Sequence, residues 1–413
     1  MGMNAKKWQC LTGMLLLAVG PLFSSEARAQ AGEYFLAPSI TLAEVFDDNV
    51  FHTSSRREHD FITRASPIVA GGYRSAPLTL IGYYTFDADY YSRHSEFTEF
   101  NAREEAGLDF RYLPDPRLTL SLGARYTETE ISSDLNFETG LAAGRLNAER
   151  FSITPGAVYR FDARTAGNVS YTFTDDKIQG EGGGPGIDTE THSATVGLDY
   201  RVTRRDTASL AYTYRRFNFE GESEDAHVPT VGWTHQLTRL TSLTLAAGPR
   251  FSDGDVDPEV FALIRHRLDR GELTFGYAHS QSTVLGQIGA VETDSFEATA
   301  FYAPDRYWQF RAVPSYVISE RRSFEAKVFR ASFEVSYQLT SYMALIGAYE
   351  FTNQDGRLDR PGGADITRNV IMVGIVLTAP SWPRYDVRPG RSILPNRRLG
   401  PDGGFTPYSG EER

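Results

Sequence analysis

The sequence predicts an all-β protein: an antiparallel, up-and-down transmembrane β-barrel of about 18 strands, with about 16 as the alternative count. Three observations predict this fold class. Apolar and polar residues alternate with a period of two along most of the chain, short and long connections alternate between these segments, and the chain begins with the pattern of a secretory signal.

Composition excludes several other classes. Among 413 residues, 13% are aromatic and one is cysteine. The aromatic content is too high for intrinsic disorder, and one cysteine cannot build a disulfide scaffold. No uninterrupted run of the ~20 apolar residues that a membrane helix needs occurs in the chain. The net charge of −11 disfavours a nucleic-acid partner. Length alone suggests two or three domains, but the strand pattern favours one closed sheet.

Residues 1–29 read as a signal peptide. Lys6 and Lys7 precede the apolar stretch 11–22, and Ala27-Arg28-Ala29 forms a small-residue cleavage site. We expect cleavage after Ala29; the alternative is a buried N-terminal helix. Cys10 leaves with the signal, so the exported chain has no thiol. That suits a protein that crosses the oxidising periplasm of a Gram-negative envelope.

Residues 30–378 carry the strand pattern of the predicted outer-membrane barrel. In residues 78–91, Leu80 and Tyr84 fall on one face while Thr79 and Thr85 fall on the other. Segments of about ten such residues can cross a bilayer at a tilt of about 45°. The same alternation recurs in residues 118–127, 193–202, 242–247, 272–277 and 329–337.

The connections alternate in kind, as they do in an up-and-down barrel with periplasmic turns and external loops. Short turns are predicted at 74–77, 113–117, 161–164, 202–206, 237–239, 268–270, 303–306 and 339–341. Longer loops, rich in acidic residues, glycine and serine, are predicted at 47–60, 92–99, 131–147, 175–188, 220–225, 252–257, 282–294, 320–325 and 353–365. A soluble sandwich or propeller would also alternate. Aromatic residues at strand ends, such as Tyr90 and Tyr159, favour the membrane, and the irregular spacing of the turns disfavours a propeller.

Several short motifs resemble a known family. An acidic Asp47–Phe51 segment follows the first strand, the second strand contains Ala65–Pro67 and Gly71–Tyr73, and Tyr83–Tyr84 follows. This pattern resembles the second β-barrel porin family, outer-membrane barrels associated with exopolysaccharide and exosortase systems. The resemblance implies a role in moving a polysaccharide across the outer membrane. The final strand departs from the family pattern because it does not end the protein in an aromatic residue.

If the apolar faces contact lipid, the alternate side chains face a lumen. Charges of both signs there can form cross-strand ion pairs or hydrogen-bond a passing solute. The predicted lumen-lining residues are Asp87, Asp89, Glu105, Asp109, Arg111, Arg125, Arg160, Asp199, Arg201, Arg215, Arg250, Glu272, Glu297, Arg311, Arg330 and Glu334.

The sequence predicts no catalytic site, no cofactor and no metal. Its histidines are scattered and show no pairing with carboxylates at a catalytic spacing. The glycine-rich segment Gly182–Gly186 lacks the Lys-Ser/Thr of a phosphate loop. Neither Asp47-Asp48 nor Asp253-Gly254-Asp255 completes a calcium loop. A TonB-dependent receptor is disfavoured, since about 22 strands and a plug need a longer chain.

Residues 379–413 are rich in proline, glycine and arginine and cannot extend a strand ladder. We expect a periplasmic tail: a linker, a segment that enters the lumen, or a segment that binds a periplasmic export component through Arg391, Arg397 and Arg398. The predicted function is a passive outer-membrane conduit for a secreted polysaccharide through a charged lumen. The alternatives are a general diffusion porin and a barrel-anchored surface enzyme or adhesin. The expected partners are outer-membrane lipid and lipopolysaccharide, the polysaccharide and periplasmic export components, with no nucleic acid.

Overall fold

A computed structural model describes residues 32–54, 57–136, 138–141, 145–178, 186–252, 254–321, 324–356 and 365–379. The predicted signal peptide, and the predicted tail from residue 380 onward, lie outside these residues. No helix in the described part of the chain is long and apolar enough to cross a membrane.

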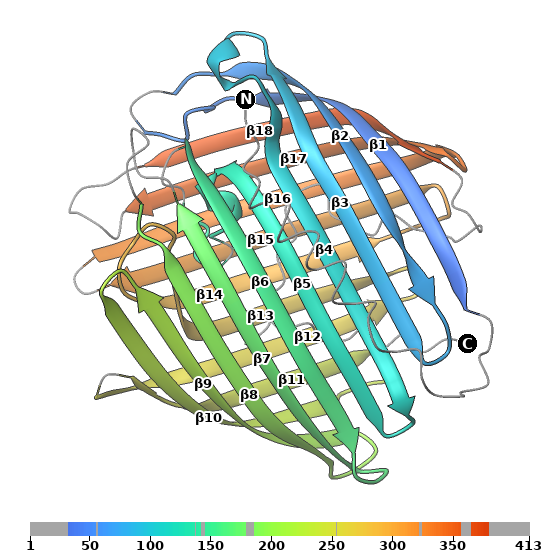
Figure 1. The fold of residues 1–413 in the computed structure, drawn as a ribbon, viewed down its shortest axis with the longest axis vertical. Coiled ribbons are helices and arrows are strands. Elements are labelled where there is room, and N and C mark those ends of the chain that lie inside the picture. The colour runs from blue at the N-terminus through green and yellow to red at the C-terminus, as the bar shows by residue number, and fades with distance from the viewer. Residues whose placement is uncertain are drawn as a thin grey trace.

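Eighteen antiparallel strands form one closed sheet (Figure 1). Each strand pairs with its neighbours in sequence, and β1 closes the barrel by pairing with β18 from Ser39↔Thr378 to Asp47↔Val370. The predicted fold class is therefore confirmed. The strands are β1 (Glu33–Asp47), β2 (Asp60–Arg74), β3 (Leu78–Tyr91), β4 (Glu99–Asp115), β5 (Leu118–Ile131), β6 (Arg145–Arg160), β7 (Thr165–Ile178), β8 (Thr189–Arg201), β9 (Asp206–Phe219), β10 (Glu222–Gln236), β11 (Thr241–Ser252), β12 (Asp255–Leu268), β13 (Gly271–Ser282), β14 (Val291–Tyr302), β15 (Trp308–Arg321), β16 (Phe324–Thr340), β17 (Met343–Gly356) and β18 (Ile366–Thr378).

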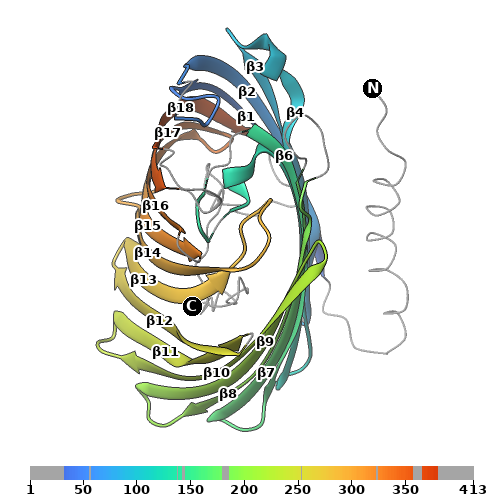
Figure 2. The same cartoon turned by 90° about the vertical axis from the view of Figure 1, so that its left-hand side faces the viewer.

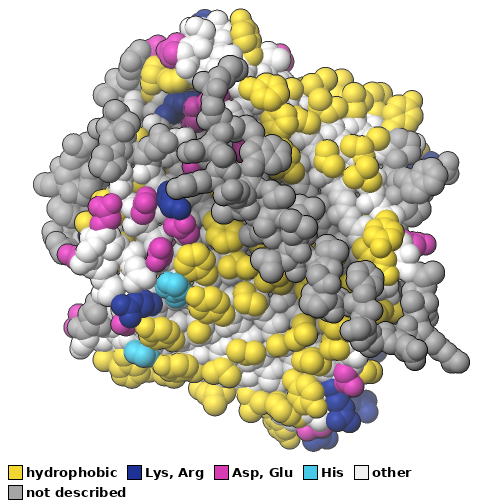
Figure 3. All heavy atoms as spheres, viewed as in Figure 1, with side chains coloured by type: hydrophobic (Ala, Val, Ile, Leu, Met, Phe, Trp, Pro, Cys, Tyr) yellow, Lys and Arg dark blue, Asp and Glu magenta, His cyan; other side chains and the backbone are white. Residues whose placement is uncertain are grey.

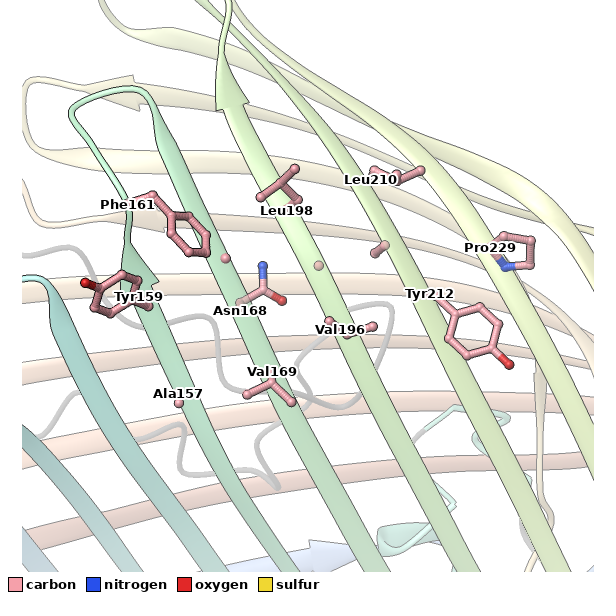
Figure 4. Close-up of a pocket in the computed structure, with 13 residues that line it drawn as sticks. Ala157, Tyr159, Phe161, Asn168, Val169, Val196, Leu198, Leu210, Tyr212 and Pro229 are labelled. Atoms are coloured by element: carbon pink, nitrogen blue, oxygen red, sulfur yellow. The ribbon is translucent and has the colours of Figure 1, made fainter.

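The outer face of the barrel is apolar. Large side chains such as Leu210 (58% exposed), Val231 (66%) and Val373 (64%) point away from the barrel interior, and Figure 3 shows how such side chains gather over the strands. An exposed apolar surface of this extent is stable in contact with lipid rather than water. A depression of about 630 Å³ lies on this face across β6–β10, with Tyr159, Phe161 and Tyr212 among its lining residues (Figure 4). Its lining is mostly apolar, like the rest of the outer face.

The strands are longer than the predicted ten residues, at 12 to 17. Three connections predicted as longer loops are tight instead, since the ladder continues almost to the turn: Glu222 pairs with Phe219, Asp255 with Ser252, and Phe324 with Arg321. At the first of these, Gly221 adopts a φ of 79°, which a two-residue hairpin requires and which glycine adopts without strain. The acidic and glycine-rich composition was therefore a turn signal here.

Both chain ends of the barrel and the eight short turns predicted from the sequence lie at one end, which we call the turn end. The connections β1–β2, β3–β4, β5–β6, β7–β8, β13–β14 and β17–β18 lie at the other end, the loop end, together with the three tight hairpins. In bacterial barrels the short turns face the periplasm and the longer connections face outward. Three clusters of buried apolar side chains lie inside the barrel, and residues of the β1–β2, β5–β6 and β13–β14 connections contribute to them.

Candidate functional site: the lumen and the loops that cross it

One side of the inner surface, formed by β2–β5 and β14–β18, carries most of the charged side chains at mid-barrel; we call it the charged wall. On β2, Arg64 binds Asp89 of β3 through two hydrogen bonds of 2.6 and 2.7 Å, and Asp87 lies 3.8 Å from the same guanidinium. On β4, Glu105 accepts a hydrogen bond of 2.5 Å from Tyr83. These charged side chains are held in place by their partners on neighbouring strands.

The opposite side of the inner surface, formed by β6–β11, is uncharged over its middle; we call it the hydroxyl wall. Its inward positions in residues 152–158, 166–174, 189–197, 207–213, 226–236 and 242–248, which the structure describes completely, hold only Ser, Thr, Gly, Ala, Val, Asn and Gln. Cross-strand threonine hydroxyls lie within hydrogen-bond distance. The pairs are Thr154 with Thr172 (3.1 Å), Thr195 with Thr213 (2.9 Å) and Thr234 with Thr244 (3.1 Å).

The strand register places all the predicted lumen-lining side chains on the inner face, opposite the exposed apolar ones. They lie on β3 (Asp87, Asp89), β4 (Glu105, Asp109, Arg111), β5 (Arg125), β6 (Arg160), β8 (Asp199, Arg201), β9 (Arg215), β11 (Arg250), β13 (Glu272), β14 (Glu297), β15 (Arg311) and β16 (Arg330, Glu334). Those on the strands of the hydroxyl wall lie near the strand ends: Arg160, Asp199 and Arg201 at the turn end, and Arg215 and Arg250 at the loop end.

The structure brings some of these residues together through partners that sequence reasoning missed. Arg215 and Arg250 share Glu259 of β12, at 2.6 and 3.5 Å. The fully buried Arg250 also contacts Asp257 (3.2 Å) and Glu292 (2.5 Å). Arg64 was missed too, although it shares the inner face of β2 with Ser66, which donates a hydrogen bond of 2.5 Å to Asp87. Extending the period of two through every strand would have found it.

Two connections at the loop end fold into the barrel, where the sequence predicted external loops (Figure 2). In the β5–β6 connection, which contains the short helix η2 (Ser132–Asp134), Leu135 is fully buried and Leu141 is 5% exposed. In the β13–β14 connection, Val284 is 1% and Leu285 4% exposed. Because these four apolar side chains are buried among inward-facing ones, the two loops pack inside the barrel.

These two loops, which we call the bridge, contact opposite parts of the inner surface. Leu285 packs in a cluster with Leu135 and with Ala148 of β6 and Ile178 of β7. Val284 packs with Leu141 and with Ala326 and Val328 of β16. Strands β6–β7 and β16 are far apart around the barrel, so the bridge spans the lumen near the loop end.

Polar tethers fix the bridge. Asn136 accepts a hydrogen bond of 3.0 Å from the Leu285 backbone and donates one of 2.9 Å to the Leu141 carbonyl, so it joins the two loops. Glu224 of β10 accepts from the Ala290 backbone at 3.3 Å, and Arg321 of β15 donates to the Ile288 carbonyl. The β13–β14 loop is thus held from three separate parts of the chain.

The β1–β2 and β3–β4 connections are joined by His94, whose ring lies 3.0 Å from both Glu58 and Asp60. Burial opposes the charged imidazolium, but the hydrogen bonds with Glu58 and Asp60 outweigh it and raise the pKa of His94. His52 differs. Burial, followed by the positive charges of Arg368, Arg145 and Arg330, holds the pKa of His52 well below its usual value.

The barrel interior carries polar and charged side chains, including carboxylates, a common class of metal ligand. Within the described ranges no group of three or more His, Cys, Asp or Glu side chains is arranged to hold a metal ion. Some inward carboxylates, such as Asp89 and Glu259, form ion pairs with arginine. The histidines that lie close to carboxylates are in loops or on the outer face.

The closed antiparallel barrel, with an apolar outer face and a polar inner face, defines an outer-membrane β-barrel protein. No protein-family model matches the chain, and no curated protein matches it. Similar solved structures include OccAB4 of Acinetobacter baumannii (12% identity, TM-score 0.45, 85% of this chain and 99% of that one) and OpdO of Pseudomonas aeruginosa (12%, 0.45, 84% and 97%). The siderophore receptor PirA of P. aeruginosa is another (8%, 0.41, 83% and 80%). The strand pairing itself establishes the barrel, and likenesses at this score identify neither a solute nor a partner.

Proposed function

We propose that this protein is a passive channel for hydrophilic solutes across the outer membrane. The observation that carries the proposal is the inner surface, which is polar along the barrel and is crossed by a bridge that narrows the lumen. The predicted charged residues then line the permeation path, where several are held by ion pairs, as Asp89 is by Arg64 and Arg215 by Glu259. A narrow polar passage is suited to selection among small solutes.

The export of a secreted polysaccharide is the more specific form of this proposal, and the family resemblance of the sequence supports it. The conduit would then act with the polysaccharide and with periplasmic export components. A polymer chain would have to pass beside the bridge or displace it, since the bridge reaches from β6–β7 to β16. Small solutes need no such movement, so the structure favours the porin form.

Two measurements test the proposal. The purified full-length protein, reconstituted in planar bilayers, should give discrete conductance steps in KCl, and a barrel that never conducts would contradict any channel function. For the specific form, a deletion strain should retain polysaccharide inside the envelope. If its surface polysaccharide stays at the normal level, export is excluded while the porin form stands.

A further inference from the structure

We propose that uncharged, hydroxyl-bearing solutes cross this barrel along the hydroxyl wall, and that the inward threonines of β6–β9 determine this preference. The inference rests on the proposed channel function and names its substrate class. It concerns a feature that the predicted charged lumen did not anticipate: the charges are concentrated on the other side.

The first step is the chemistry of the wall. Thr154, Thr172, Thr195 and Thr213 point inward from four consecutive strands, and each pair is joined by one hydroxyl hydrogen bond. A hydroxyl has one donor and two acceptor sites, so a single bond between two threonines leaves both able to bind further groups. A solute hydroxyl can therefore exchange its water for a threonine at little net cost.

The second step is access. Thr154, Thr172 and Thr195 are partly exposed, and small residues lie among them: Gly156 on β6 and Gly197 on β8 are also inward. A Cβ built at Gly156 would lie 2.9 Å from Ser121 Oγ, and one at Gly197 would lie 2.8 Å from the Asn168 amide. The glycines thus make room for neighbouring polar side chains, and the polar groups of the wall stay close to its surface.

The third step is the contrast with the charged wall. There several of the groups that could bind a charged solute are already paired, as Arg64 is with Asp89 and Glu105 with Tyr83. A charged solute would have to compete with these pairs, and on the hydroxyl wall it would find no counter-ion. A neutral polyol needs no counter-ion and does not have to break an ion pair. The hydroxyl wall therefore fits neutral polyols.

The test compares three probes of similar size: glucose, glucuronate and glucosamine. Proteoliposomes with the full-length protein should take up glucose faster than either charged sugar, as measured by swelling. A variant carrying Thr154→Val, Thr172→Val, Thr195→Val and Thr213→Val should lower the glucose rate by about two- to tenfold while keeping its KCl conductance. The matched control, Thr299→Val with Ser332→Ala, removes inward hydroxyls from the strands of the charged wall and should leave the glucose rate unchanged.

The outcomes separate the two proposals. An unchanged glucose rate in the fourfold variant, an equal loss in the control, or faster entry of a charged sugar would overturn the preference while the channel stands. Heat-modifiable migration on gels shows whether the fourfold variant still forms the barrel, and single substitutions at Thr154 and Thr195 provide variants less prone to misfold. If the wild-type protein showed no conductance and no swelling, the channel function would be wrong, and the solute preference would be wrong with it.

Discussion

The charged wall and the hydroxyl wall belong to one barrel and share one strand period, yet their inward polar groups differ in kind: one wall carries ionised groups and the other carries neutral hydroxyls. In the charged wall, buried charges that would be costly without a counter-ion lie next to one, as in the contact of 2.6 Å between Arg64 and Asp89. The hydroxyl wall uses groups that tolerate either water or one another. We therefore expect the charged wall to be sensitive to single substitutions and the hydroxyl wall to tolerate them.

The largest expected effect follows from breaking a charged pair. Arg64→Ala leaves Asp89, which is 3% exposed, without its guanidinium partner. We expect the free energy of unfolding to fall by about 3–5 kcal/mol, the usual cost of stranding a buried charge. Urea unfolding in phospholipid vesicles measures it.

The control for this prediction removes both charges. Arg64→Met combined with Asp89→Leu should recover much of the loss, because neither charge is then left unpaired. Should Arg64→Ala prove as stable as the wild type, the pairing account of the charged wall would be wrong.

The bridge between the two walls gives the next effect. Leu285→Ala removes a 4% exposed side chain from the cluster with Leu135, Ala148 and Ile178. Docking of the β13–β14 loop should weaken by about 2–5 kcal/mol. Hydrogen exchange at the Leu285 backbone should accelerate and single-channel conductance should rise, because the bridge no longer narrows the lumen. The control is Leu245→Ala on the outer face of β11, which should leave the conductance unchanged. Equal conductance in the two variants would argue against a bridge that limits flow.

The alternation of short and long connections was enough to predict the strand number, and the period of two was enough to predict the barrel and to propose an inward face with Asp87, Arg215 and Glu334. It could not predict the partners of these residues. Glu259 meets both Arg215 and Arg250 because of the register between neighbouring strands and the reach of long side chains, neither of which is encoded in one strand. The bridge was missed for a related reason. Leu135, Leu141 and the adjacent Val284 and Leu285 are short apolar stretches in polar loops, and only the closed barrel supplies the surface that buries them.

A small effect should follow on the hydroxyl wall. Thr172→Val removes one member of the pair with the partly exposed Thr154 and keeps the shape of the side chain. The free energy of unfolding should change by no more than about 1.5 kcal/mol, since the hydroxyl that remains can bind water in the lumen. The same urea titration used for Arg64→Ala compares the two walls directly. A loss as large as that of Arg64→Ala would remove the distinction between them.

The smallest effect concerns the loop end, where charge pairing is used outside the barrel wall. His94 has a pKa raised above its ordinary value of 6.5 by Glu58 and Asp60. The imidazolium therefore ties the β3–β4 loop to the β1–β2 loop fully below pH 6.5, and the tie is lost as the pH rises through the raised pKa. Trypsin cleavage at Arg93 should be slower, relative to a His94→Gln variant, at pH 6 than at pH 9. If the ratio of the wild-type cleavage rate to the His94→Gln cleavage rate stays constant from pH 6 to pH 9, the protonation of His94 does not hold the loops together.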